Sequence, residues 1–155
     1  MPATKVKAYL DTKGIKYVSI LHSPAYTAPE VAASAHVSGR DFAKTVIVMI
    51  EDEMAMVVLP ASRHVLLSDL RELIERSHLR LASEAEFKDR FPDCELGAMP
   101  PLGNLYGMPT YVSGELAEER EIAFNAGSHT EVIKMSYDDF ERLVQPTVLE
   151  FITTP

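Results

Sequence analysis

Two apolar stretches in the first half of the chain decide the fold: TVIVMI at residues 45–50 and MAMVVL at residues 54–59. The acidic tripeptide EDE, at residues 51–53, separates them. Two such runs around a short polar interval predict an antiparallel β-hairpin with a solvated turn. Both runs are apolar at successive positions rather than at alternate ones, so we expect other elements to cover both faces of the hairpin.

Helical and extended patterns interleave on both sides of this hairpin. We expect helices over residues 6–13 (before Gly14), 27–38 (from Thr27), 66–74 (with Ser68 as N-cap), 83–91 (from a Ser83–Glu86 capping box) and 136–144. We expect further strands over residues 15–21, 110–113, 121–125 and 132–135. The order lacks strict βαβ alternation, which indicates an α/β (α+β) fold with a mixed, mostly antiparallel sheet flanked by helices.

The composition is that of an ordinary soluble domain. The chain has 155 residues, of which 46% are hydrophobic and 25% charged, and we expect a single domain over residues 1–155. Cys94 is the one cysteine, so the chain forms no internal disulfide, and we expect a reducing compartment. No stretch approaches the ~20 apolar residues of a membrane span, and residues 1–7 lack the apolar core of a secretory signal. We therefore expect a cytoplasmic protein without a membrane partner.

The charge balance limits the nucleic-acid partners. The formal net charge is −8, and no dense basic run occurs. Because proteins bind DNA by neutralising phosphates with lysine and arginine, this balance argues against a DNA-binding protein. Any contact with RNA is expected to use a local patch, to be brief, or to take place beside a partner.

Common catalytic motifs, such as the phosphate-binding P-loop and the zinc-binding HExxH, do not occur in this sequence. The five histidines show no short metal-ligand spacing, so we predict no metal and no cofactor. Lys44, at the mouth of the 45–50 strand, is a candidate for a partly desolvated cation that polarises a carbonyl or holds a phosphate. A solvated lysine at a strand end explains the same pattern.

Two loops are further candidates. In the segment GAMPPLG at residues 97–103, glycine lets a ligand approach the backbone while prolines hold the loop in shape; a rigid surface loop is the alternative. In the segment NAGSHT at 125–130, His129 is placed to meet a ligand, and backbone amides near Gly127 could form an oxyanion hole. An ordinary turn at Gly127 explains this segment equally well. Cys94 has no recognisable catalytic partner and is interpreted as a buried thiol.

Taken together, these segments resemble the YbaK/prolyl-tRNA editing-domain family, also called the INS-like aminoacyl-tRNA deacylases. The resemblance runs from about residue 6 to residue 144, in the family's order. The matching segments are HSP at 22–24, YTAPE at 26–30, AKTV at 43–46, LASE at 81–84, GAMPP at 97–101, GSH at 127–129 and IKMS at 133–136.

The resemblance implies a curved mixed sheet and hydrolysis of the ester between a wrong amino acid and the 3′ end of tRNA, commonly tRNA for proline. By position, Lys44 would bind and polarise the substrate near the ester. Gly97 and Pro101 would shape the aminoacyl pocket and present backbone amides, and Gly127 and His129 would line its other wall. The family's water attack is assisted by a ribose hydroxyl of the tRNA. The implied partners are aminoacyl-tRNA and, as a further candidate, an aminoacyl-tRNA synthetase.

Three apolar side chains are candidate pocket walls, with core packing as an equal alternative: Ile20, Met49 and Met99. Two other kinds of protein stay open at this point. The first is a non-catalytic regulatory module that holds an amino acid or nucleotide in the same pocket. The second is an interaction protein with an exposed apolar patch, for which residues 148–152 are a candidate.

Overall fold

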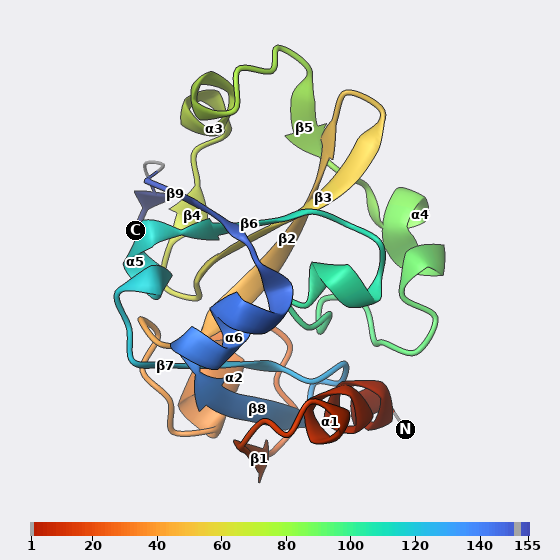
Figure 1. Cartoon of the computed structure of the whole chain (residues 1–155), viewed down its shortest axis with the longest axis vertical. Helices are drawn as coiled ribbons and strands as arrows, with labels where there is room; N and C mark the ends of the chain where they lie inside the picture. Colours follow the sequence, from red (N-terminus) through yellow and green to blue (C-terminus); the bar gives the residue numbers. More distant parts are fainter. Residues whose placement is uncertain (1, 151–152) are drawn as a thin grey trace.

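The computed structural model describes residues 2–150 and 153–155 (Figure 1). The helices are α1 (Pro2–Thr12), α2 (Ala28–Ser34), α3 (Leu67–Leu73), α4 (Glu84–Phe87), α5 (Gly114–Ala117) and α6 (Tyr137–Val144), with 3₁₀ helices η1 (Lys88–Arg90) and η2 (Gly103–Leu105). The strands are β1 (Tyr17–Leu21), β2 (Ala43–Ile50), β3 (Glu53–Pro60), β4 (His64–Val65), β5 (Leu79–Leu81), β6 (Thr110–Ser113), β7 (Glu121–Asn125), β8 (Glu131–Ser136), β9 (Thr147–Leu149) and β10 (Thr153–Thr154).

The predicted hairpin is confirmed and forms the centre of the molecule (Figure 1). β2 and β3 pair antiparallel from Ala43–Pro60 to Ile50–Glu53, and the acidic turn is exposed. Every residue of β3 from Ala55 to Pro60 is buried. Neighbouring residues of β3 contribute to different apolar clusters on the two faces, as Val57 and Val58 do. Both faces of the hairpin are therefore covered, as its continuous apolar runs predict.

The strands form a mixed, mostly antiparallel arrangement, as expected, but in more than one sheet. The large sheet has the order β5-β2-β3-β6-β9, in which β6 runs parallel to both β3 and β9. A second, fully antiparallel sheet has the order β1-β8-β7. A parallel bridge between Phe42 and Ala123 links the start of β2 to β7, and so joins the two sheets.

Helices cover the two faces of the β1-β8-β7 sheet with separate apolar clusters. α1 and α6 pack on one face through residues such as Leu10 and Phe140. α2 packs on the other face through Val31, beside Phe42 and Ala123. Successive side chains at the start of β2 point to opposite faces. Phe42 therefore packs in the α2 cluster, and Ala43 packs in the α1–α6 cluster.

Local capping explains where most of these helices begin. Thr27 and Ser83 each form a capping box with the glutamate three residues later, and Ser136 caps α6. Ser68 is not an N-cap, contrary to the prediction: the extended residue before α3 is Leu66, so Ser68 already lies inside the first turn. The helix expected to run from Ser83 to Phe91 is α-helical only to Phe87 and continues as η1.

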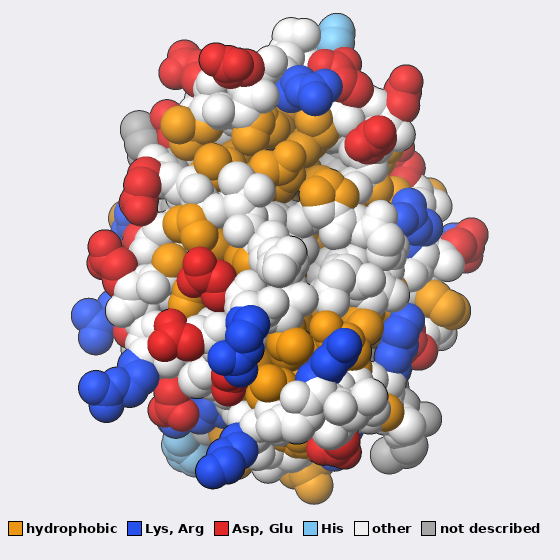
Figure 2. Space-filling view, in the orientation of Figure 1, with side chains coloured by type: hydrophobic (Ala, Val, Ile, Leu, Met, Phe, Trp, Pro, Cys, Tyr) orange, Lys and Arg blue, Asp and Glu red, His pale blue; other side chains and the backbone are white. Residues whose placement is uncertain are grey.

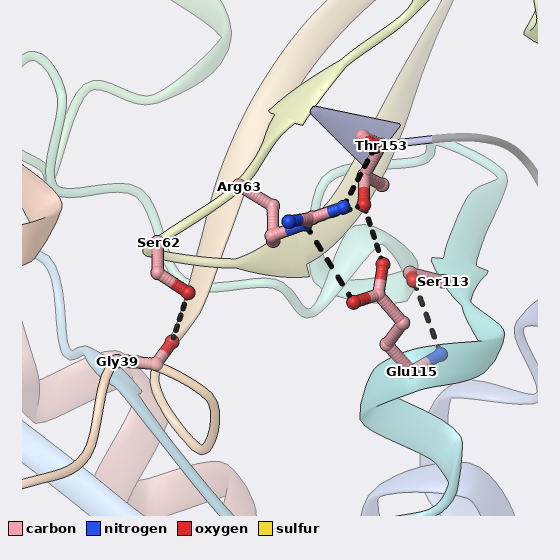
Figure 3. A network of polar contacts seen from close by, with 6 residues as sticks. All are labelled: Gly39, Ser62, Arg63, Ser113, Glu115 and Thr153. Atoms are coloured by element: carbon pink, nitrogen blue, oxygen red, sulfur yellow. Dashed lines mark hydrogen bonds and ion pairs between the residues drawn. The ribbon is translucent and has the colours of Figure 1, made fainter. Parts of the chain in front are cut away.

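The end of the chain is held against the large sheet by a polar network (Figure 3). Arg63 donates hydrogen bonds from Nε to Thr153 Oγ1 and from Nη2 to the Thr153 carbonyl, both at 2.8 Å. The Thr153 hydroxyl in turn donates to Glu115 Oε1 at 2.6 Å. Of the predicted patch at 148–152, Val148 lies in β9 beside β6, and residues 151–152 lie outside the described part of the chain. Within the described residues, no helix is long and apolar enough to cross a membrane.

Candidate functional site

Lys44 is the second residue of β2 and is half-buried. Its cross-strand partner is Leu59, which belongs to the apolar cluster beneath α3, while Phe42, two residues earlier, belongs to the cluster beneath α2. The ammonium group therefore lies between two apolar clusters. Burial lowers the pKa of Lys44 below its ordinary value. Within residues 2–150 and 153–155, the side chain of Lys44 makes no hydrogen bond and no ion pair that would offset this desolvation.

The second sheet continues the surface on which Lys44 lies. At the Phe42–Ala123 bridge, the Ala123 N–H donates to the Asp41 carbonyl at 3.0 Å. Residues two positions apart in a strand lie on the same face. Because the pairing is parallel, Lys44, two residues after Phe42, and Asn125, two residues after Ala123, therefore lie on the same face. Asn125 is paired with Val132, and Val132 is paired with Ile20. Ile20 and Lys44 therefore belong to one face, at opposite sides of a row of four strands.

Two loops meet directly after Asn125. The Gly127 N–H donates to the Ala98 carbonyl at 3.0 Å, and the Glu95 N–H donates to the Gly127 carbonyl at 2.8 Å. These bonds bring the predicted segments at 97–103 and 125–130 together. They also occupy the amide of Gly127, which is therefore not available as an oxyanion donor. The Gly97 N–H donates no hydrogen bond within the described part of the chain and is one of the free amides of this loop pair.

His129 is buried where these loops meet the segment after β1. Its backbone N–H donates to Glu95 Oε1 at 2.9 Å, and its ring Nδ1 lies 3.7 Å from the same oxygen. The carboxylate of Glu95 thus holds the backbone of His129 by a hydrogen bond and lies near its ring. The ring centroid of Tyr26, an exposed residue, lies 5.0 Å from that of the imidazole, and the Ala25 N–H donates to the His129 carbonyl at 3.3 Å.

His22 extends the site at the end of β1. Its N–H donates to the Thr130 carbonyl at 2.9 Å, which continues the β1–β8 pairing by one residue. Its ring Nδ1 lies 2.8 Å from the Ser23 carbonyl, so this nitrogen carries the proton and Nε2 is an acceptor in the neutral ring. Nε2 is buried and has no partner among the described residues.

The other predicted site residues lie apart from this group. Met99 packs in an apolar cluster with Ile47, which projects from the face of β2 opposite Lys44. Met49 lines a cleft of about 540 Å³ at the far end of β2, together with Arg71 and His78. Pro101 is buried, as is the whole segment 98–103, so this is not a surface loop. The structure therefore groups Lys44, Ile20, Gly97, Gly127 and His129, and leaves Met49 and Met99 elsewhere.

A larger cleft, of about 600 Å³, lies beside the acidic turn of the hairpin and is also distant from Lys44 along β2. In Figure 2, apolar side chains gather in the upper part of the view, near α3 and the hairpin, with acidic side chains on both sides. Ala55, Ile74 and Tyr111 line this cleft, and Glu51 and Asp52 border it. Its acidic border is unsuited to the phosphates of a nucleic acid.

Metal ligands and a cysteine nucleophile are two further kinds of functional group to look for in the structure. Among the described residues, no group of three or more His, Cys, Asp or Glu side chains is arranged to hold a metal ion. The Cys94 thiol lies 3.4 Å from the Tyr106 hydroxyl, and burial raises its pKa to about 11, so it is protonated at neutral pH.

Sequence reasoning missed four residues of this site: Asn125, Glu95, Tyr26 and His22. Tyr26, His22 and Asn125 stand in segments quoted from the sequence, but no pattern marks the roles of Tyr26 and His22. Asn125 carries a faint signal, because it is a polar residue that ends the apolar strand EIAFN directly before the Gly127 turn. Its place beside Lys44 depends on contacts between residues about 80 positions apart, which periodicity does not report.

Sequence comparisons agree with the arrangement of these segments. Residues 22–143 match the profile of the aminoacyl-tRNA editing domain. The multifunctional Ser/Thr-tRNA deacylase ProXp-y of Escherichia coli (strain K12) is 32% identical over 105 residues, and so is the protein of that name from Escherichia coli O157:H7. The alignment covers 66% of this chain and 62% of the relative, so the chain spans less than two thirds of that relative's length.

Solved structures share the fold. A protein described as hypothetical has a TM-score of 0.84 and 21% sequence identity, over 95% of this chain and 98% of its own. A proposed trans-editing enzyme for prolyl tRNA synthetase has a TM-score of 0.81 and 21% identity, over 97% of this chain and 96% of its own. These likenesses establish the fold, and the profile match covers far more than half of the sequence. The chain therefore belongs to the family of aminoacyl-tRNA editing domains.

Proposed function

We propose that this chain is a trans-editing aminoacyl-tRNA deacylase, which hydrolyses the ester that joins a small wrong amino acid to the 3′ end of tRNA. The observation that carries the proposal is Lys44: a half-buried cation without a protein partner, in a chain of the editing-domain family. A desolvated cation is costly to the fold unless a ligand uses it. The phosphates at the 3′ end of tRNA are anions, and the oxygen of the ester carbonyl carries a partial negative charge. Both are ligands that a lysine ammonium group attracts.

In this mechanism Lys44 polarises the ester carbonyl or holds the terminal phosphate, and so stabilises the negative charge that develops in the transition state. The free N–H of Gly97 is a second donor for the carbonyl oxygen, since the N–H of Gly127 is already bonded. His129, held by Glu95, forms the wall beside Gly97. The exposed ring of Tyr26 offers a surface on which the terminal base can stack.

The attacking water needs a base, and we assign this role to the substrate. The family resemblance implies that a ribose hydroxyl of the tRNA assists the water. Cys94 is protonated at neutral pH and is an unsuitable nucleophile. The protein's part is therefore positioning and electrostatic stabilisation.

For the substrate, we propose tRNA for proline that carries a small amino acid, with serine and threonine favoured. The family resemblance suggests this tRNA, and the relative in Escherichia coli is a Ser/Thr-tRNA deacylase. Small amino acids that differ by one methyl group are separated in a single pocket by only ~1–3 kcal/mol, so a second, hydrolytic site is the usual solution. An aminoacyl-tRNA synthetase is the proposed protein partner, and the cytoplasm the proposed compartment.

The second candidate is a regulatory module that binds an amino acid or nucleotide without turnover. The acidic net charge of −8 favours it, because strong independent binding of tRNA needs more positive charge. Thermal stabilisation by such free ligands, without hydrolysis of any charged tRNA, would identify this module.

A deacylation panel tests the proposal. tRNA for proline is charged with alanine, cysteine, serine, threonine or proline, and amino-acid release is followed with wild type, Lys44→Ala and Lys88→Ala. Lys88 is an exposed lysine of η1 and serves as the matched control. We expect wild type and Lys88→Ala to release serine or threonine, and Lys44→Ala to be slower by about 100-fold or more. Full activity of Lys44→Ala would overturn the role of this residue.

A further inference from the structure

Asn125 is a buried amide in the apolar part of the site. It ends β7, and only 7% of its surface is exposed. Its cross-strand neighbour is Val132, whose own neighbour is Ile20, and both belong to or pack on the apolar cluster beneath α2. Asn125 is thus the polar residue between this apolar row and Lys44.

The Oδ1 atom of Asn125 is buried and accepts no hydrogen bond from any described residue. Buried side-chain amides normally have partners, because removal of an amide from water without a new hydrogen bond is unfavourable. A leucine has nearly the same size and would fill this position without that cost. The fold does not use the Oδ1 atom of Asn125, which lies on the same face as the unpaired Lys44. This arrangement indicates a ligand that supplies the missing hydrogen bond.

We propose that Asn125 is a specificity-determining residue, whose amide binds the side-chain hydroxyl of serine or threonine in the aminoacyl ester. This inference rests on the proposed deacylase function. A hydroxyl can donate to Oδ1 and accept from Nδ2, so it matches either end of the amide. Ile20, which is only partly buried at the edge of this row, offers an apolar contact to the carbon atoms of a small side chain but no hydrogen bond, whereas Val132 is fully buried beneath α2. Alanine has the same carbon frame as serine without the hydroxyl.

The chain offers a matched control for this residue. Thr110 on β6 is also buried, at 6% exposure, and its Oγ1 likewise has no partner among the described residues. Its neighbour in the sheet is Met56, which packs with Ile47 on the side of β2 opposite Lys44. Thr110→Val removes an unpaired polar group without change of shape, away from the proposed site.

The test compares hydroxyl selectivity in wild type, Asn125→Leu and Thr110→Val. kcat/KM is measured for tRNA charged with serine and with alanine, and binding is measured for non-hydrolysable amide-linked seryl- and alanyl-adenosine. We expect wild type and Thr110→Val to prefer the seryl form by at least about 10-fold, and Asn125→Leu to reduce this preference to less than about 3-fold. Asn125→Leu should melt at or above the wild-type temperature, because it removes a buried unpaired amide.

The two readouts separate the possible failures. If wild type hydrolyses neither ester but binds the seryl analogue more tightly in an Asn125-dependent way, the deacylase function is wrong and the role of Asn125 stands. If wild type binds both analogues equally, or if Asn125→Leu lowers both rates without change in their ratio, Asn125 does not select the hydroxyl. Equal binding of the two analogues by wild type would overturn the role of Asn125 without any variant, and if Asn125→Leu does not fold, Asn125→Ala is compared in its place.

Discussion

Gly97 and His129 lie so close together that any side chain at position 97 would touch the imidazole ring. An ideal Cβ on Gly97 would be 3.5 Å from His129 Nε2. Gly97 also has a φ of +84°, a backbone conformation that residues with a side chain rarely adopt. The backbone conformation thus favours glycine, and a Cβ at this position would add a van der Waals contact with the imidazole ring.

Gly97→Ala is expected to lower both stability and activity, and Gly14→Ala separates the two causes. Gly14 has a φ of +68°, and a Cβ there would meet no atom within 4 Å. Each variant should lose about 1 kcal/mol of unfolding free energy, since both place alanine in the left-handed region. Deacylation should fall only in Gly97→Ala. Equal activity of the two variants, measured beside urea unfolding, would show that the contact with His129 is unimportant.

The charge on Lys44 predicts a pH dependence. Burial lowers the pKa of this group, so it loses its proton at a lower pH than an ordinary lysine, whose value is 10.5. The ammonium form is the active form, and therefore the ratio of enzymatic to spontaneous ester hydrolysis should fall as pH rises into the alkaline range. Lys44→Arg, which stays charged, should show a flatter profile over the same range. A ratio that rises with pH in wild type would contradict the electrostatic role.

Cys94 should be an unreactive thiol. Burial raises its pKa to about 11, against an ordinary value of 9.0, so the thiolate population at neutral pH is reduced about 100-fold. We expect a disulfide-exchange reagent such as DTNB to modify the folded protein at least ~100-fold more slowly than the urea-unfolded protein. Cys94→Ala should deacylate tRNA at the wild-type rate. Rapid modification accompanied by loss of activity would show that the thiol belongs to the site.

The network around Arg63 should stabilise the end of the chain. Arg63 makes two hydrogen bonds to Thr153 and lies 3.8 Å from Glu115, with 32% of its side chain exposed (Figure 3). Arg63→Ala is expected to lower the unfolding free energy by about 1–2 kcal/mol. The control is Arg142→Ala, which removes an exposed pair with Asp139 and should cost less than about 0.5 kcal/mol. Similar losses in the two variants would mean that β10 adds little stability.

Local signals were sufficient to predict much of the fold. The hairpin follows from two apolar runs around an acidic turn, and the Ser83–Glu86 box follows from reciprocal hydrogen bonds within four residues. The Ser68 prediction failed because a serine can cap a helix only where its backbone is extended, and here that residue is Leu66. The choice between these positions is made by packing of α3 on the sheet.

The long-range pairings could not be predicted in this way. β6 is parallel to β3, and β2 approaches β7 at a single bridge, so the partition into sheets depends on residues far apart in sequence. Lys44, Gly97, Gly127 and His129 are predicted from their segments as site residues. The face on which Met49 lies depends on register, since each step of one residue along β2 reverses the face, and the position of Met99 depends on packing of its loop against Ile47. The bridge between Phe42 and Ala123 likewise sets the face on which Asn125 lies.

The central claim is that Lys44 serves the reaction and not the fold. Lys44→Met keeps an unbranched side chain, one atom shorter than lysine, and removes the charge. It therefore tests this claim most directly in a paired measurement of single-turnover deacylation of seryl-tRNA and thermal unfolding. Since burial disfavours the charged form of Lys44 at neutral pH, the variant should melt at the wild-type temperature or up to about 4 °C above it. Its deacylation rate should fall by about 100-fold or more. A variant that melts normally and deacylates at the wild-type rate would contradict the account.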